Sequence, residues 1–106
     1  MTLTPYEIQI LNEVYDYIKQ NFTGTIYIDR LAKSYKISET TLCNAFKYLH
    51  HKTINQHRLE TCMQKGKEML QNGQKIKTVA EALGYSSSSS FSKTYRKVHF
   101  VLSKNI

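Results

Sequence analysis

Apolar residues recur every three to four positions along most of this chain, which is the spacing of one face of an α-helix. The first stripe runs through residues 5–22, from Ile8 to Phe22, and the segment 21–24 supplies its stop signal. A shorter stripe follows in residues 28–35, and another begins after Ser38, which we expect to act as an N-cap. The pattern predicts one amphipathic helix and then a helix, a tight turn and a helix.

A second start signal lies at Thr53. Thr53 and Gln56 have the spacing of a capping box, in which each side chain bonds the backbone N–H of the other residue. The apolar stripe that follows reaches Leu70, and Asn72 and Gly73 form a common helix end. We therefore predict a long central helix in residues 53–73.

The helix-turn-helix pattern returns after this helix. The apolar stripe of residues 28–35 recurs 48 positions later, and residues 84–86 repeat residues 36–38 at the same offset. The helix that follows recurs at an offset of 49 positions. The corresponding apolar and basic residues are Ile28, Leu31, Ala32 and Tyr35 with Ile76, Val79, Ala80 and Leu83, and Leu42, Phe46 and Lys47 with Phe91, Tyr95 and Arg96. Two helix-turn-helix units explain this repeat.

Five consecutive serines, residues 86–90, open the last of these helices in our interpretation. A serine run is more often a flexible linker. Serine is also a good N-cap, however, and Phe91, Tyr95 and Val98 continue an apolar face directly after the run. We therefore expect a helix to begin within the serines.

Composition and charge narrow the class of protein. The chain has 106 residues, 41% of them hydrophobic and 22% charged, which is enough for one modest core or two very small ones. The formal net charge of the chain is +7. Residues 1–27 carry one basic and three acidic residues (1 − 3 = −2), and the remaining residues carry 14 basic and five acidic residues (14 − 5 = +9). Such a field favours a polyanion, although a lysine-rich solvated surface has the same composition.

Nothing in the first residues, Met1 to Pro5, resembles an export signal, and no apolar run is long enough to span a membrane. We expect a soluble, cytoplasmic and nucleoid-associated protein without membrane contact. Cys43 and Cys62 fit a reducing compartment, in which two cysteines are usually plain thiols.

The repeat resembles the DNA-binding domain of the AraC/XylS family of bacterial transcription regulators. The strongest stretch is Ile76, Val79, Ala80, Leu83, Gly84, Tyr85, Ser86, Ser87, Ser89, Phe91, Ser92, Lys93, Tyr95, Arg96 and Lys97, and the first half matches through Leu31, Ala32, Ile37, Ser38, Leu42, Phe46 and Lys47. The resemblance implies an all-α fold of about seven helices in residues 1–106. It places two three-helix helix-turn-helix subdomains, residues 5–52 and 74–106, on either side of a linker helix at residues 53–73.

The chain departs from the family at several positions. The family's usual tyrosine and arginine on the central helix are His57 and Cys62 here, and its usual turn glycines are Lys36, His51 and Phe100. A lysine at positive φ costs on the order of 1 kcal/mol relative to glycine. The family's Thr-Pro after the last turn is Leu102 and Ser103, so we expect the C-terminal tail to be placed differently or frayed.

The resemblance also implies which side chains meet double-stranded DNA. The base-reading positions would be Thr40, Cys43, Asn44, Ser88, Ser89, Ser92 and Lys93, and the phosphate-contacting positions would be Ser38, Lys47, Ser87, Arg96 and Lys97. Asn44 and Lys93 are the best base readers in this set, because serine and threonine form single hydrogen bonds that discriminate bases poorly. An ordinary solvated helix face is the alternative for each position.

Other chemistries fit less well. His50, His51, His57 and Cys62 lack the paired spacing of a zinc site, so we expect no metal, and we place His50 and His51 in an exposed turn. No motif positions a base beside Cys43, although oxidation there would obstruct the reading surface. Most aromatic residues fall on the core stripes, leaving Tyr48 and Tyr27 for backbone contacts.

We therefore expect a non-enzymatic, sequence-specific DNA-binding module that needs no cofactor and inserts two recognition helices into adjacent major-groove segments. The alternative is a helical module that has lost sequence readout and binds DNA nonspecifically or docks a protein. The resemblance adds RNA polymerase, and a sensing or dimerisation domain outside this chain, as further partners. It leaves open whether the chain is an excised domain or a stand-alone small regulator.

Overall fold

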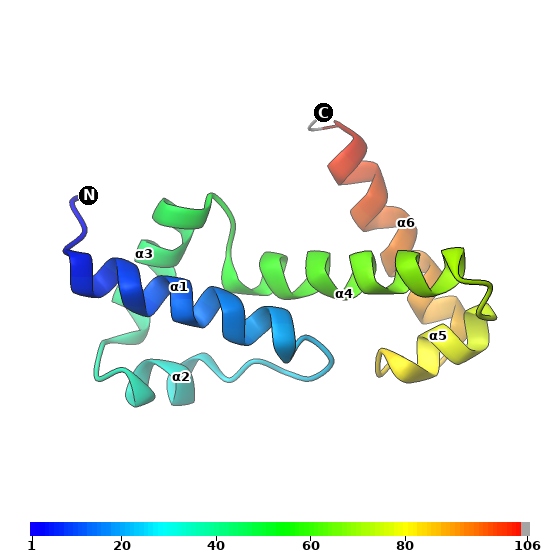
Figure 1. Cartoon of the computed structure of the whole chain (residues 1–106), viewed down its shortest axis with the longest axis horizontal. Helices are drawn as coiled ribbons and strands as arrows, with labels where there is room; N and C mark the ends of the chain where they lie inside the picture. The colour runs from blue at the N-terminus through cyan, green and yellow to red at the C-terminus, as the bar shows by residue number, and fades with distance from the viewer. Residues whose placement is uncertain (105–106) are drawn as a thin grey trace. The chain divides into compact units, whose positions relative to one another are not determined.

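The chain folds into α-helices connected by short turns. The computed structural model describes residues 1–104, with side chains through His99, and contains six helices and no strand in that range. The helices are α1 (Pro5–Gln20), α2 (Ile28–Ser34), α3 (Glu39–His50), α4 (Ile54–Gln71), α5 (Ile76–Ala82) and α6 (Ser88–Lys104) (Figure 1). The predicted all-α fold is confirmed.

Two compact units make up the chain, Met1–Arg58 and Leu59–Ile106. The first unit contains α1, α2, α3 and the first turn of α4. The second contains the remainder of α4 together with α5 and α6. Each unit therefore holds one helix-turn-helix pair and has its own core.

Local capping sets the helix starts. The Thr4 and Glu7 side chains bond each other's backbone N–H groups in a capping box ahead of α1. The predicted box at Thr53 and Gln56 is present, with hydrogen bonds of 2.7 and 3.1 Å. α4 ends at Gln71, and Gly73 follows it at φ 88°, as the Asn-Gly signal predicted.

The core of the first unit lies between α1, α2 and α3. Val14, Ile18, Leu42 and Phe46 are fully shielded from solvent. The buried cluster comprises Ile10, Leu11, Val14, Ile18, Ala32, Leu42, Ala45, Phe46 and Ile54. Because α3 contributes three of these residues from one face, its opposite face is left to solvent.

The second unit packs α5 and α6 around the C-terminal part of α4. Met63, Val79 and Phe91 are fully buried, and Tyr85 packs edge-on against Phe91 with ring centroids 5.6 Å apart. Phe91 is therefore in the core, as predicted, and the helix does continue through the serine run.

Both helix-turn-helix turns are built alike. After α2, Lys36 adopts φ 56° and the Ile37 N–H donates to the Ala32 carbonyl at 3.1 Å. After α5, Gly84 adopts φ 86° and the Tyr85 N–H donates to the Ala80 carbonyl at 2.9 Å. The two turns therefore have the same backbone shape, and the left-handed position is a lysine in the first unit and a glycine in the second.

At several individual positions the structure differs from the sequence pattern. Ile8 and Ile76, which lie on the predicted apolar stripes, are 37% and 43% exposed. His50, which we placed in an exposed turn, lies inside α3 and is half-buried. These residues occupy the edges of their helical stripes, or the end of a helix, where periodicity alone does not decide burial.

Residues 1–104 contain six helices, whereas the resemblance implied about seven. The resemblance implied a turn at Phe100, but α6 continues through this position to Lys104. A phenylalanine resists the left-handed conformation that a glycine would adopt at such a turn, so the helix is the lower-energy path. The side chains of Phe100, Leu102 and Ser103 lie outside the described residues, as does the placement of the tail beyond Lys104.

Candidate nucleic-acid interface

The outer face of α3 carries the candidate residues of the first unit. Thr40, Cys43, Asn44 and Lys47 follow one another at intervals of three, one and three positions, so they share one side of the helix. Thr40, Asn44 and Lys47 are exposed, and Cys43 is half-buried at the edge. The structure therefore brings these four positions together on a surface that the core leaves free.

Ser38 is held by the start of its own helix. Its Oγ accepts a hydrogen bond from the Thr41 N–H at 3.1 Å and lies 2.7 Å from the Thr41 Oγ1. Ser38 is exposed, so a phosphate can approach it. Its hydroxyl hydrogen is donated to Thr41 Oγ1, however, so a phosphate contact would replace that hydrogen bond while the cap to the Thr41 N–H could remain.

α6 repeats this arrangement in the second unit. Ser89, Ser92, Lys93 and Arg96 lie 49 positions after Thr40, Cys43, Asn44 and Lys47, respectively. Ser89, Lys93 and Arg96 are exposed, while Ser88 and Ser92 are half-buried, and Lys97 is exposed beside them. The opposite face of α6 buries Phe91 and Val98.

Ser87 caps α6 as Ser38 caps α3. The Ser90 N–H donates to the Ser87 Oγ at 3.1 Å, and the two hydroxyl oxygens lie 3.0 Å apart. Ser38 and Ser87 are separated by 49 positions, whereas Lys36 and Gly84 are separated by 48. The second turn therefore contains one additional residue, Ser86, between Tyr85 and the cap, which explains the change of offset in the sequence repeat.

The outer faces of α3 and α6 differ in charge. α3 carries Glu39 and Lys47, which cancel. Among residues 88–99, whose side chains are described, α6 carries Lys93, Arg96 and Lys97 and no acidic residue, which gives a charge of +3. The Arg96 Nε also donates to the Ser92 carbonyl at 3.4 Å, which holds the guanidinium along the helix surface. The face of α6 is therefore much more attractive to phosphate than the face of α3.

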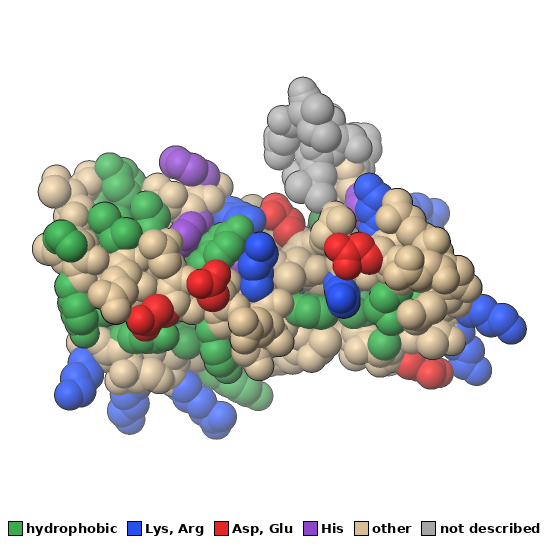
Figure 2. All heavy atoms as spheres, in the orientation of Figure 1, with side chains coloured by type: hydrophobic (Ala, Val, Ile, Leu, Met, Phe, Trp, Pro, Cys, Tyr) green, Lys and Arg blue, Asp and Glu red, His purple; other side chains and the backbone are tan. Residues whose placement is uncertain are grey.

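Further basic residues lie outside α3 in the first unit. Arg30, Lys33 and Lys36 are exposed on α2 and the turn that follows it. Lys and Arg side chains project from this edge of the unit in Figure 2. These three residues were not among the predicted site residues, although they contribute to the excess of positive charge after residue 27.

Cys43 is a poor candidate for reactive chemistry. Burial, and to a smaller extent the Glu39 carboxylate, raise the pKa of the Cys43 thiol. A thiol is a weak nucleophile until it ionises, so this environment disfavours catalysis and oxidation. Base reading by Cys43 stays a prediction.

Two of the four histidines, His50 and His57, pack in the first unit. His57 is 1% exposed, its ring stacks on Tyr15 at a centroid distance of 3.9 Å, and its Nε2 lies 3.0 Å from the Tyr15 carbonyl oxygen. His50 packs on the same Tyr15 ring at 4.6 Å. His51 is exposed and ends α3 at φ 61°. No group of three potential metal ligands occurs among the residues with described side chains.

Tyr48 and Tyr27, left over by the core assignment, are 52% and 54% exposed. Tyr48 lies next to Lys47 on α3 and is available to a DNA backbone. Tyr27 instead lies beneath the Arg30 guanidinium, whose carbon is 4.6 Å from the ring centroid. A contact with a DNA backbone stays a prediction for both residues.

None of the helices in the described part of the chain is both long and apolar enough to cross a membrane. A family model described as a helix-turn-helix domain, of the AraC type, matches residues 31–102, which is more than half of the chain. No curated protein and no solved structure matches the chain.

Proposed function

The chain belongs to the AraC-type helix-turn-helix family, a family of DNA-binding transcription regulators and not of enzymes, and we propose that it binds double-stranded DNA with sequence specificity. In this proposal α3 and α6 are the two recognition helices. They enter adjacent segments of the major groove, about one helical turn or roughly 34 Å apart.

The repeated exposed face is the observation that carries this proposal. Four positions on α3 recur on α6 at a constant offset of 49, and in both helices the face behind them is buried. A core requirement accounts for the buried positions only. Solvation accounts for polar side chains on an outer face in general, and we attribute the pairing of similar residues at corresponding positions, Thr40 with Ser89 and Lys47 with Arg96, to a common ligand.

We assign base reading and backbone contact to different side chains. Asn44 can bond an adenine through two hydrogen bonds, and Lys93 can reach guanine, so these two residues carry most of the readout. Thr40, Cys43, Ser88, Ser89 and Ser92 add weaker contacts to base edges. Lys47, Arg96 and Lys97, with the caps Ser38 and Ser87, contact phosphates and set the register without reading sequence.

Because the two helices differ in charge, we propose that they contribute differently to affinity and to specificity. α6, with three basic residues and four serines in residues 88–99, contributes mainly affinity, because counterion release depends on the number of phosphates neutralised. α3, with Asn44 and no net charge, contributes mainly specificity. We include RNA polymerase, and a sensing or dimerisation domain outside this chain, among the proposed partners of such a regulator.

A binding selection tests the proposal. The 106-residue chain is incubated with duplexes that contain a randomised segment, and bound duplexes are recovered and sequenced over several rounds. Two short conserved blocks separated by about one helical turn are expected. Binding without enrichment of any motif would contradict sequence specificity and favour the second candidate, a nonspecific DNA-binding module. That candidate is favoured by the scarcity of bidentate base readers on α6.

A footprint of the selected duplex then tests the use of two helices. Protection is expected in two major-groove segments on one side of the DNA. A single protected segment would mean that one unit is only a scaffold for the other.

A further inference from the structure

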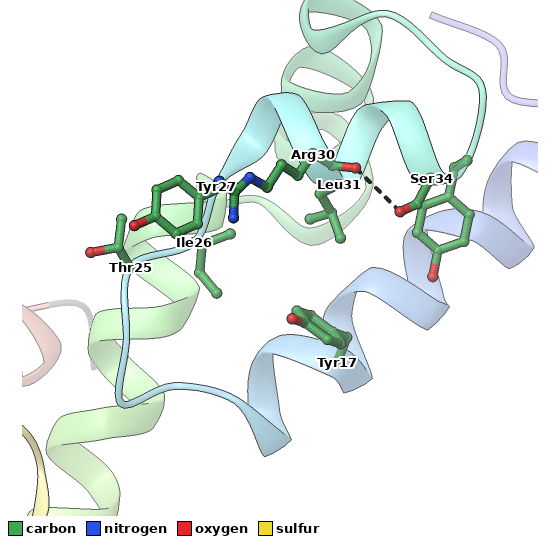
Figure 3. Close-up of a pocket in the computed structure, with 8 residues that line it drawn as sticks. Tyr17, Thr25, Ile26, Tyr27, Arg30, Leu31 and Ser34 are labelled. Carbon is green, nitrogen blue, oxygen red and sulfur yellow. Dashed lines mark hydrogen bonds between the residues drawn. The ribbon is translucent and has the colours of Figure 1, made fainter.

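The first unit contains a cavity that the proposed DNA contacts do not use. It lies between the second half of α1, the extended segment 25–27 and α2, and its volume is about 310 Å³ (Figure 3). That volume is at the lower end of the range for small-molecule sites, roughly 300 to 1,000 Å³. The space is large enough for a ligand with one aromatic ring.

Aromatic and aliphatic side chains form most of the lining. Tyr17 on α1 and Tyr27 before α2 border the cavity with half-exposed rings, and Tyr35 borders it at the end of α2. Ile26 and Leu31 add aliphatic surface. Burial, and to a smaller extent the nearby Glu13 carboxylate of α1, raise the pKa of Tyr35. A flat ring would find stacking partners here, because tyrosine rings pack against other aromatic rings in offset or edge-on geometry.

Arg30 is the one charged side chain in this lining. Its guanidinium lies over the Tyr27 ring, with the carbon 4.6 Å from the ring centroid, and its backbone carbonyl accepts a hydrogen bond from Ser34 Oγ at 3.2 Å. Within the described part of the chain, no carboxylate forms an ion pair with Arg30. The guanidinium is therefore oriented by an aromatic ring while its donors remain available to an anion.

We propose that this cavity binds a small planar aromatic anion, with its ring among the tyrosines and its anionic group on Arg30. A cationic ligand is disfavoured by the charge of Arg30, and a purely aliphatic anion would leave the tyrosine faces without a stacking partner. None of the DNA-contact residues of α3 lines the cavity, although Arg30 also belongs to the basic edge formed by α2 and the turn after it, and the probes below contain no nucleic acid. Failure of the DNA-binding proposal would consequently leave this one standing, and the reverse holds too.

Three matched probes test the chemistry. The ¹⁵N-labelled 106-residue chain is titrated with phenylacetate, with cyclohexylacetate, which keeps the charge but has no flat ring, and with phenylacetamide, which keeps the ring but has no charge. Phenylacetate is expected to shift the amide signals of Thr25, Ile26 and Leu31 with a Kd on the order of 1 mM or tighter. The other two probes are expected to bind at least about tenfold more weakly.

Two variants test the location. Arg30→Met removes the charge and keeps an apolar stem, and it is expected to weaken phenylacetate binding at least about tenfold. Lys33→Met, on the same helix but outside the lining, is the matched control and is expected to leave binding unchanged. A third variant, Ser34→Trp, places a bulky ring in the wall and is expected to abolish the shifts while the spectrum remains that of a folded protein.

Three results would overturn the proposal. They are the absence of shifts with phenylacetate at 20-fold the expected Kd, equal binding of phenylacetate and cyclohexylacetate, and equal loss of binding in Arg30→Met and Lys33→Met. The last two would indicate general attraction of anions to a basic surface.

Discussion

The Gly66 backbone lies directly against the Phe91 ring, with no room for a side chain at Gly66. A Cβ built on Gly66 would lie 3.0 Å from Cζ of Phe91 and 3.1 Å from Cδ1 of Leu83. Gly66 is buried in the middle of α4, and Phe91 is fully buried near the start of α6. The absence of a side chain at Gly66 therefore makes room for the largest apolar residue of the second core.

Gly66→Ala tests this contact. Alanine favours a helix interior by up to about 1 kcal/mol over glycine, but overpacking a core costs typically 1–3 kcal/mol. We expect a net loss of about 1 kcal/mol, measured by urea unfolding. Gly24→Ala is the matched control, since nothing lies within 4 Å of the added Cβ there. An increase in stability for Gly66→Ala would show that Phe91 can move away at little cost.

Lys36→Gly is expected to stabilise the first unit. Lys36 adopts φ 56°, a left-handed conformation that costs a residue with a Cβ on the order of 1 kcal/mol relative to glycine. The expected gain of about 1 kcal/mol is measured by thermal or urea unfolding. Lys33→Gly, inside α2, loses the same charge and is expected to destabilise by about 1 kcal/mol. Equal effects of the two variants would contradict the strained turn.

The stability of the first unit should depend on pH through His50. Burial is the main cause that lowers the pKa of His50, and Lys52 and His51 lower it further, against the opposing effects of the Leu11 carbonyl and Asp16. Because the folded-state pKa lies below the unfolded value of about 6.5, the unfolded chain binds the proton first as pH falls. Stability is thus fully present above about pH 6.5 and declines as the pH falls through the folded-state pKa.

His50→Gln is the variant that isolates this effect. Urea unfolding at a series of pH values between about 8 and 5 should show a smaller loss of stability for His50→Gln than for the parent chain. Burial also lowers the pKa of His99 in the second unit, so His99→Gln serves as the comparison that accounts for the remaining slope. An unchanged profile in His50→Gln would exclude His50 as the source.

Asn44→Ala should reduce specificity more than general affinity. Losing a bidentate base contact is expected to weaken the selected duplex by about 1 to 3 kcal/mol and to relax preference at one base pair. Fluorescence anisotropy on the selected duplex and its single-base variants measures both effects. Asn12→Ala, at an exposed position of α1, is the control and should bind as the parent does. An unaltered base preference in Asn44→Ala would remove this residue from the reading set.

Arg96→Ala should weaken selected and random duplexes about equally. A phosphate contact positions the protein without reading sequence, and each one adds about one unit to the salt dependence. For the parent chain, neutralising roughly 5 phosphates predicts a log–log slope near −4 to −5, and Arg96→Ala should reduce its magnitude by about one. Lys19→Ala on α1 removes a charge away from the proposed surface and should leave the slope as it was. A slope near zero in the parent chain would exclude DNA as the principal partner.

The repeat made the corresponding positions of α3 and α6 recognisable from the sequence, while their role in DNA binding stays a prediction. The constant offset between α3 and α6 identified corresponding positions, and helical periodicity separated Phe46 and Phe91 from the outer faces. The exposed basic residues of α2 were not among the predicted site residues, because they lie outside the two helices that the repeat singled out. The pairing of the Ser87 and Ser90 hydroxyls was missed because a serine run contains several equivalent caps, and only the backbone path selects one.

What the sequence by itself determined is local: the capping box at Thr53 and Gln56, the N-cap at Ser38 and the helix end before Gly73 all depend on residues within one turn of one another. The tertiary structure decided which of two chemically similar residues is buried. His50 lies against Tyr15 while the adjacent His51 is exposed, and Ile76 is exposed while Ile54 is buried. Burial at the edge of a helical stripe depends on whether another helix covers that edge, and such contacts join residues far apart in the chain, so no local pattern encodes them.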